Sequence, residues 1–421
     1  MDRTFEFNDS ISAHFKPLND IVYMPTRAIE EITGLNEVIS SLIFTMWMGL
    51  VLSFGFNFLT LPKHRKLYSV ATGLFLGFYF HGLGYFICLA QFSLFYPFLR
   101  YMPRRHAFTL AVGFATIVMC VRNFFFFWNN ILGGDLNLRV QCTVVFMRVH
   151  MFMCNYVDAE VLDDPVKGKH LISYERKFAA YLRELPSFYD WASYNLFTPF
   201  SFIGESVEYG IFDNFINMRG DITKMRPHSN VIPAIQRFVH SLICFIVFYY
   251  LSIIAEPFGM VTPEFMEHNC IYKLVFLLIA ANSKIYNLFS RFVYHEAGLI
   301  ATGISYKAKD EKNPEEFNSI RCMDINGFNW GSTAKDSISK WNMRTQHWLK
   351  YYVMMRFMDR DMPRGSFQLV AILKTFAVSA IFHGYYIGYY LFFSGLFLLD
   401  LAWKLMGGTA FAANVSKRMP E

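Results

Sequence analysis

The stretch "SAIFHGYYIGYY" (residues 379–390) places His383 between an apolar run and a group of tyrosines. Apolar segments flank this histidine on both sides, over residues 367–382 and 385–405. By length and composition we interpret both as membrane segments. An ionisable side chain inside such a segment is costly to bury in lipid and by default indicates a functional site. A second Phe-His-Gly triplet lies around His81, so the triplet by itself does not identify a functional histidine.

The composition of the whole chain supports a membrane protein. Of its 421 residues, 54% are hydrophobic, 19% are aromatic and only 17% are charged. A soluble chain usually carries about a quarter charged residues. The formal net charge of +6 comes largely from short basic loops such as "PKHRK" (62–66) and "RYMPRRH" (100–106), which is the pattern of cytoplasmic loops rather than of a nucleic-acid surface. We therefore predict an all-α polytopic membrane protein and no nucleic-acid partner.

The apolar runs predict roughly ten or eleven transmembrane or re-entrant helices. The first is an uncleaved span at 38–61. The run at 67–99 is interrupted by "HGLG" (81–84) and is expected to be two short helices that turn near Gly82 and Gly84. Further spans are expected at 106–128, 140–156, 231–255 and 271–289, with a shorter one reaching residue 304 and two more at 367–382 and 385–405.

Two regions do not read as plain lipid-facing spans. Arg148, His150 and Asn155 lie inside the span at 140–156, so it is expected to face protein or a cavity. Residues 185–217 are aromatic and broken by prolines, which is tolerated at membrane depth only when the segment is buried in protein or lines a cavity. We expect one integral-membrane domain over 1–421, with a polar arm at 1–37, a membrane core at 38–405 and a tail at 406–421.

His383 and Asn342 are the two leading candidates for chemistry. With an ordinary pKa of about 6.5, a histidine can accept and return a proton at cellular pH; the alternative is a neutral histidine hydrogen-bonded between helices, which is the interpretation for His81. A buried asparagine can donate to a developing oxyanion. Its alternative is a helix N-cap, common where a polar loop, here 307–340, becomes a helix.

The remaining candidates are weaker. Arg344, Lys350 and Arg356 could receive phosphates or could equally extend their charges to the membrane interface. His150 and His347 are interpreted as satisfied core histidines. The seven cysteines are dispersed without CxxC spacing, which argues against a disulfide framework and a zinc site. No metal is expected.

The Asn342 and His383 pair resembles the membrane-bound O-acyltransferase superfamily, in which a Trp-Asn ends a long polar loop and a histidine lies in an apolar C-terminal segment. "WNMRTQHWLKYYVMMR" (341–356), "SAIFHGYYIGYYLFF" (379–393) and the Pro-Ser and Glu-Tyr elements of 185–217 are similar to its lysophospholipid acyltransferase branch. Two positions depart from that pattern, because Glu205 stands where proline is expected and Phe382 where tryptophan is expected.

The resemblance implies transfer of a fatty acyl group from acyl-CoA to the hydroxyl of a lysophospholipid, in the membrane of the endoplasmic reticulum. It implies His383 as general base, Asn342 as positioning or oxyanion-stabilising residue, and a central catalytic chamber. No cofactor is expected, since acyl-CoA is a co-substrate, and lysophospholipid and membrane lipid are the expected partners. Expected substrate-binding residues are Trp341, Arg344, Lys350, Glu208, Tyr209 and Tyr386. The alternatives are a different acceptor (a protein or a neutral lipid) and a non-enzymatic lipid transporter.

Overall fold

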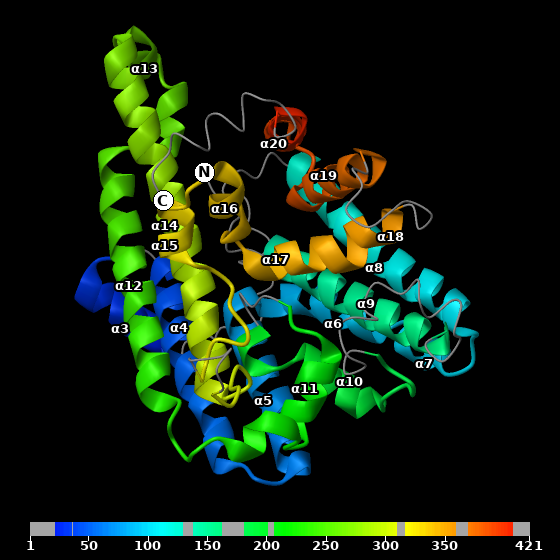
Figure 1. Cartoon of the computed structure of the whole chain (residues 1–421). Helices are drawn as coiled ribbons and strands as arrows, with labels where there is room; N and C mark the ends of the chain where they lie inside the picture. The colour runs from blue at the N-terminus through cyan, green and yellow to red at the C-terminus, as the bar shows by residue number, and fades with distance from the viewer. Residues whose placement is uncertain are drawn as a thin grey trace.

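In the computed structural model of the chain, every regular element among the described residues is a helix (Figure 1). The described residues are 22–35, 37–128, 138–161, 181–200, 206–309, 316–358 and 369–406. The expected tail at 406–421 and the Glu205 position lie outside them, apart from residue 406. The all-α prediction is confirmed for this part of the chain.

The first helices differ in one respect from the sequence prediction. The expected polar arm contains a ten-residue helix, α3 (Met24–Thr33), which ends at Gly34 in the left-handed conformation. Its approach to the body is fixed by Tyr23, whose hydroxyl donates to the carbonyl of Tyr79 at 2.9 Å. The predicted first span is α4 (Glu37–Phe54), followed by a 3₁₀ turn, η2 (Gly55–Phe58).

The predicted break near Gly82 is confirmed. Helix α5 (Pro62–His81) ends there because Gly82 has φ 55° and ψ −150°, a conformation that a residue with a side chain rarely adopts. A 3₁₀ turn, η3 (Gly82–Gly84), leads into α6 (Tyr85–Ser93), and the short α7 (Tyr96–Leu99) follows.

Helix α9 (Leu138–Val161) contributes many residues to the hydrophobic core and packs against α8 (Arg104–Trp128) and α6. Arg148 and Asn155 on α9 are 0% and 1% exposed, so the prediction that this segment faces protein is confirmed. The broken aromatic segment is also buried: α10 (Phe188–Asn195), η6 (Thr198–Phe200) and α11 (Tyr209–Ile216) join the same core. Residues of these elements contact the candidate site described below.

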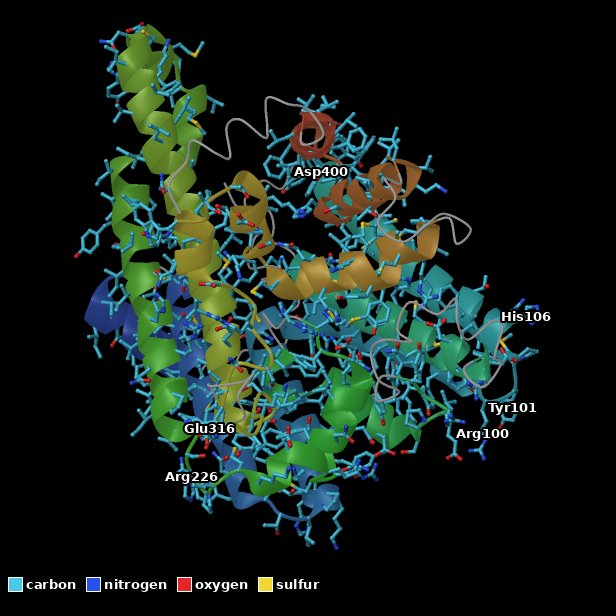
Figure 2. The ribbon with its side chains drawn as sticks, viewed as in Figure 1. Arg100, Tyr101, His106, Arg226, Glu316 and Asp400 are labelled. Atoms are coloured by element: carbon cyan, nitrogen blue, oxygen red, sulfur yellow. The ribbon has the colours of Figure 1, made fainter. Side chains whose placement is uncertain are left out.

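A long helical hairpin, α12 (Val231–Ile254) and α14 (Cys270–Thr302), stands along one side and extends beyond the body (Figure 1). The turn at its far end holds η8 (Pro257–Val261) and α13 (Pro263–Glu267). Figure 2 shows Arg226 and Glu316, which form an ion pair at 3.7 Å, near the opposite end of the hairpin.

The prediction of two separate helices over 271–304 is wrong, because α14 is continuous for 33 residues, about 50 Å at 1.5 Å per residue. The buried carboxylate within this helix, that of Glu296, is satisfied by neighbours. Glu296 accepts from the backbone N–H groups of Cys322 and Met323 at 2.6 and 2.9 Å and pairs with Arg237 of α12 at 2.8 Å. Polar residues with partners need not end a helix.

The polar loop predicted at 307–340, called the polar insertion below, contains α15 (Ile325–Asn329) and α16 (Ala334–Ser339). The chain then enters α17 (Met343–Trp348). A π-helical turn, η9 (Leu349–Met354), and α18 (Met355–Phe357) continue it. The last helices are α19 (Leu369–His383) and α20 (Ile387–Met406), which pack against each other. Figure 2 places Asp400, on α20, in the upper part of the molecule, whereas Arg226 lies near its lower end.

The described residues contain four helical segments long and apolar enough to cross a membrane, and two shorter apolar ones. The four are Ile39–Phe58, Pro62–Leu99, Arg104–Phe125 and Val231–Val261, and the two are Leu369–His383 and Ile387–Ala402. Several such helices in one chain make this a membrane protein. The count of ten or eleven and the central chamber stay predictions.

Candidate functional site

The polar insertion is fastened to the body immediately before Asn342. Trp341 packs its ring against three aromatic rings, those of Phe289 and Phe292 on α14 and Phe328 on α15, with centroids 5.1–5.9 Å apart. The backbone N–H of Met343 donates to the carbonyl of Cys322 at 2.7 Å. These contacts fix the point at which the insertion becomes α17. The substrate-binding role expected for Trp341 stays a prediction.

Asn342 caps the N-terminus of α17. Its backbone lies in the left-handed region at φ 34° and ψ 58°, and its side-chain Oδ1 accepts from the N–H of Thr345 at 3.1 Å. Asparagine tolerates this conformation better than most residues. The N-cap that the sequence offered as the alternative therefore exists. It uses the amide oxygen, and no described residue accepts from the amide nitrogen, so the catalytic role stays a prediction that is compatible with the cap.

Glu208 lies at the centre of a buried polar cluster below α17. Its carboxylate, in a residue 4% exposed, accepts from His347 Nε2 at 2.8 Å and from the Arg344 guanidinium at 3.4 Å. Arg344 also donates through Nε to the carbonyl of Ser206 at 3.0 Å. Both of its carboxylate oxygens face protein donors, which agrees with the expectation that the broken segment at 185–217 is buried in protein.

A third donor reaches the same carboxylate from the π-helical turn. The hydroxyl of Tyr352 donates to Glu208 Oε1 at 3.3 Å and accepts from Asn155 Nδ2 of α9 at 3.2 Å. Tyr352 and Asn155 are 5% and 1% exposed, so this part of the cluster is excluded from solvent and lipid. We name Glu208, Arg344, His347, Tyr352 and Asn155 the Glu208 cluster.

Helix α17 also contacts the end of α19, where His383 lies, through Trp348. Trp348 donates through Nε1 to His150 Nδ1 of α9 at 3.0 Å. The ring of Phe382, the residue before His383, packs on Trp348 at 4.6 Å and on Phe146 at 4.9 Å. His150 and His347 are therefore satisfied histidines, as predicted. One helix thus contacts both the Asn342 cap and the end of α19.

His383 is the last residue of α19 and is exposed. Its ring lies 5.3 Å from that of Tyr389 and 4.9 Å from that of Phe393, both on α20. Gly384 follows at φ 112°, which ends the helix, and Asn123 of α8 donates to the carbonyl of Ile381 at 3.4 Å. The imidazole thus lies at the junction of α19 and α20, against two rings of α20, and the residue is exposed.

The other predicted binding residues are spread over the region. Tyr209 is buried among the rings of Phe152, Tyr194 and Phe212, at 5.4–6.2 Å, which places it in the core. Tyr386 packs against Phe127 at 5.5 Å. Lys350 is exposed, with its ammonium 5.1 Å from the ring of Tyr351. Arg356, in contrast, is tied by an ion pair to Asp158 of α9.

The sequence did not indicate the partners of Glu208. Tyr352 carries no local signal, and Asn155 was noted only as a polar residue inside a span. The two are nearly 200 positions apart in the chain, so only the fold brings them together. Among the described residues no group of three or more His, Cys, Asp or Glu side chains could hold a metal ion.

Residues 138–412 match the model of the MBOAT, membrane-bound O-acyltransferase, family. This stretch covers more than half of the chain and includes Asn342, His383 and the Glu208 cluster. The chain belongs to the membrane-bound O-acyltransferase family. The resemblance read from the Trp-Asn and Phe-His-Gly elements is thereby confirmed at the level of the family.

Relatives within this family carry similar names. A Schizosaccharomyces pombe protein named lysophospholipid acyltransferase is 26% identical over 60% of this chain and 50% of its own length. Arabidopsis thaliana lysophospholipid acyltransferase 1 is 24% identical over 79% of this chain and 71% of its own length. Human membrane-bound glycerophospholipid O-acyltransferase 2 is 22% identical over 94% and 75%. The chain thus aligns with half of the fission-yeast relative and about three quarters of the human one.

Proposed function

We propose that this protein transfers a fatty acyl group from acyl-CoA to the free hydroxyl of a lysophospholipid, in the membrane of the endoplasmic reticulum. The observation that carries the proposal is that the family match includes both Asn342 and His383. The names of the relatives from fission yeast and Arabidopsis favour a lysophospholipid as the acceptor. Acyl-CoA serves as co-substrate, and no cofactor is required.

His383 would act as general base. Its imidazole removes the proton of the acceptor hydroxyl while the oxygen attacks the thioester carbonyl. The C–S bond then breaks, CoA leaves as its thiolate, and the imidazolium returns the proton to sulfur. A positioned general base contributes about 10²–10⁴-fold to the rate. The exposed position of His383 at the end of α19 supports this role, because the base must reach the substrate.

Asn342 would stabilise the negative charge that develops on the carbonyl oxygen of the thioester when the acceptor attacks. Its amide oxygen is engaged in the cap, which fixes the side chain and leaves the N–H₂ group as the donor. A donor held in advance at the developing charge lowers the barrier without reorganisation. Among the predicted binding residues, the exposed Lys350 is the one best placed for the phosphate groups of either substrate, since Arg344 pairs with Glu208.

The test uses purified protein in detergent with radiolabelled oleoyl-CoA and a panel of lysophospholipids. We expect labelled phospholipid from the parent and none above background from a His383→Ala variant of matched thermal stability. The preferred headgroup then identifies the acceptor. Product from neither protein with any headgroup would move the assignment to another acceptor, such as a neutral lipid or a protein. Equal product from both would make His383 structural.

A further inference from the structure

The spacing of the residues that hold Glu208 is unusual for a helix. His347 and Tyr352 both contact the same carboxylate oxygen, Oε1, at 2.8 and 3.3 Å. They are five residues apart, which in an α-helix of 3.6 residues per turn separates two side chains by about 140° around the axis. From an undistorted α-helix, these two side chains could not both hydrogen-bond Glu208 Oε1.

The π-helical turn over Leu349–Met354 removes this conflict. Its hydrogen bonds join residues five apart, so the helix is locally wider and side chains with that spacing come to one side. Such turns are less stable than α-helix and persist where tertiary contacts require them. Here the requirement is a buried carboxylate that needs all of its donors, since a buried charge without hydrogen bonds is strongly destabilising.

Trp348, the last residue of α17 before the π-helical turn, connects the same segment to α9. This side chain lies next to His347 in the sequence, points to α9, and bonds His150 at 3.0 Å. Phe382 packs on the indole at 4.6 Å, and His383 follows it directly. At the other end of the segment, Asn342 caps the helix that carries His347. A change in the register of this helix would therefore move the two proposed catalytic residues relative to each other.

We propose that His347 and Tyr352 are positioning residues, which hold the π-helical turn on Glu208 and thereby set the placement of Asn342 relative to His383. The inference rests on the proposed function for its effect on turnover, whereas the holding of the helix does not depend on it. Misplacement of reacting groups by about 1 Å can lower a rate by about 100-fold.

The variants His347→Leu and Tyr352→Phe remove one donor each, and His347→Gln keeps an N–H group at similar reach. We expect kcat to fall about 10- to 100-fold in His347→Leu and about 10-fold in Tyr352→Phe, with the KM for oleoyl-CoA unchanged. His347→Gln recovers most of the kcat. Matched controls are His268→Leu and Tyr250→Phe, at exposed positions near the far end of the α12–α14 hairpin.

Hydrogen–deuterium exchange provides a readout that does not need activity. Amides within 341–356 exchange faster in His347→Leu and Tyr352→Phe than in the parent, and at the parent rate in the two controls. Parent-like kcat in both variants, or unchanged exchange in this segment, overturns the proposal, as does faster exchange with unchanged kcat. If the parent forms no phospholipid at all, the proposed function fails by itself, and the exchange result alone decides whether the carboxylate holds the helix.

Discussion

The two Phe-His-Gly triplets both end a helix, and they have different surroundings. His81 ends α5 and His383 ends α19, and each is followed by a glycine with positive φ, 55° at Gly82 and 112° at Gly384. His81 is 8% exposed and its ring stacks on that of Tyr85 at 5.9 Å and 11°. His383 is exposed at its helix end. The triplet therefore specifies a helix end, and the burial of the imidazole decides whether it can meet a substrate.

The neighbours of the two histidines extend this difference. His81 lies at a bend between two helices that follow each other in the chain, and its ring packs on those of Phe80 and Tyr85. Phe382, the residue before His383, packs on Trp348 of α17. Asn342 caps this same helix, and the helix also carries residues of the Glu208 cluster. A histidine connected to distant polar residues is the one expected to carry chemistry. The following predictions test this comparison.

The largest effect is expected for His383→Ala. Loss of the general base lowers kcat about 10²–10⁴-fold, while the thermal midpoint in detergent stays close to that of the parent because the side chain is exposed. The measurement is the rate of phospholipid formation at saturating oleoyl-CoA. Loss of rate together with a large loss of thermal stability would indicate a structural histidine instead.

Asn342→Asp separates the cap from the proposed oxyanion donor. A carboxylate keeps an acceptor for the N–H of Thr345 and tolerates the left-handed backbone, so stability is retained. It has no N–H₂ group, and we expect kcat to fall about 10²–10³-fold. Asn342→Gly, which loses both side-chain functions, is the control for the cap. An Asp variant with the parent kcat would show that the asparagine serves the helix alone.

The glycines of the two triplets give a matched pair of substitutions. Ala at either site forces a side chain into positive φ, at a cost of about 1–3 kcal/mol in folding stability. Gly384→Ala also shifts the adjacent His383, and we expect about a ten-fold lower kcat per folded molecule. Gly82→Ala lowers the thermal midpoint only. Equal loss of kcat in both would contradict the distinction between the triplets.

The sequence predicted the parts of the fold that depend on local patterns. The break at Gly82, the ends of α8 and α12, the burial of Arg148 and the pairing of Asn342 with His383 in one family pattern all follow from short stretches. The cap at Asn342 was offered as an alternative and is present. The helix ends, the break and the cap require only hydropathy, helix propensity and turn residues, which are readable over a few positions. The pairing of Asn342 with His383 follows from the resemblance to the family.

The features that the sequence did not indicate depend on partners far along the chain. α14 continues through Glu296 because Arg237 and two backbone N–H groups satisfy that carboxylate. The π-helical turn likewise depends on Glu208, nearly 150 positions before Tyr352. A single sequence shows that burying such a carboxylate is unfavourable, and only the fold shows which donors stabilise it.

The smallest effect on turnover is expected for His81→Ala. The buried ring packs on Tyr85 between α5 and α6, so its removal leaves a cavity and lowers the thermal midpoint. The rate per folded molecule, measured on the monodisperse fraction after size-exclusion chromatography, stays that of the parent because the His81 ring is buried, whereas His383 is exposed. Its double variant with His383→Ala should be no slower than His383→Ala alone. A further loss of rate in the double variant, at equal folded fraction, would mean that both triplets contribute to the chemistry and that burial is not what separates them.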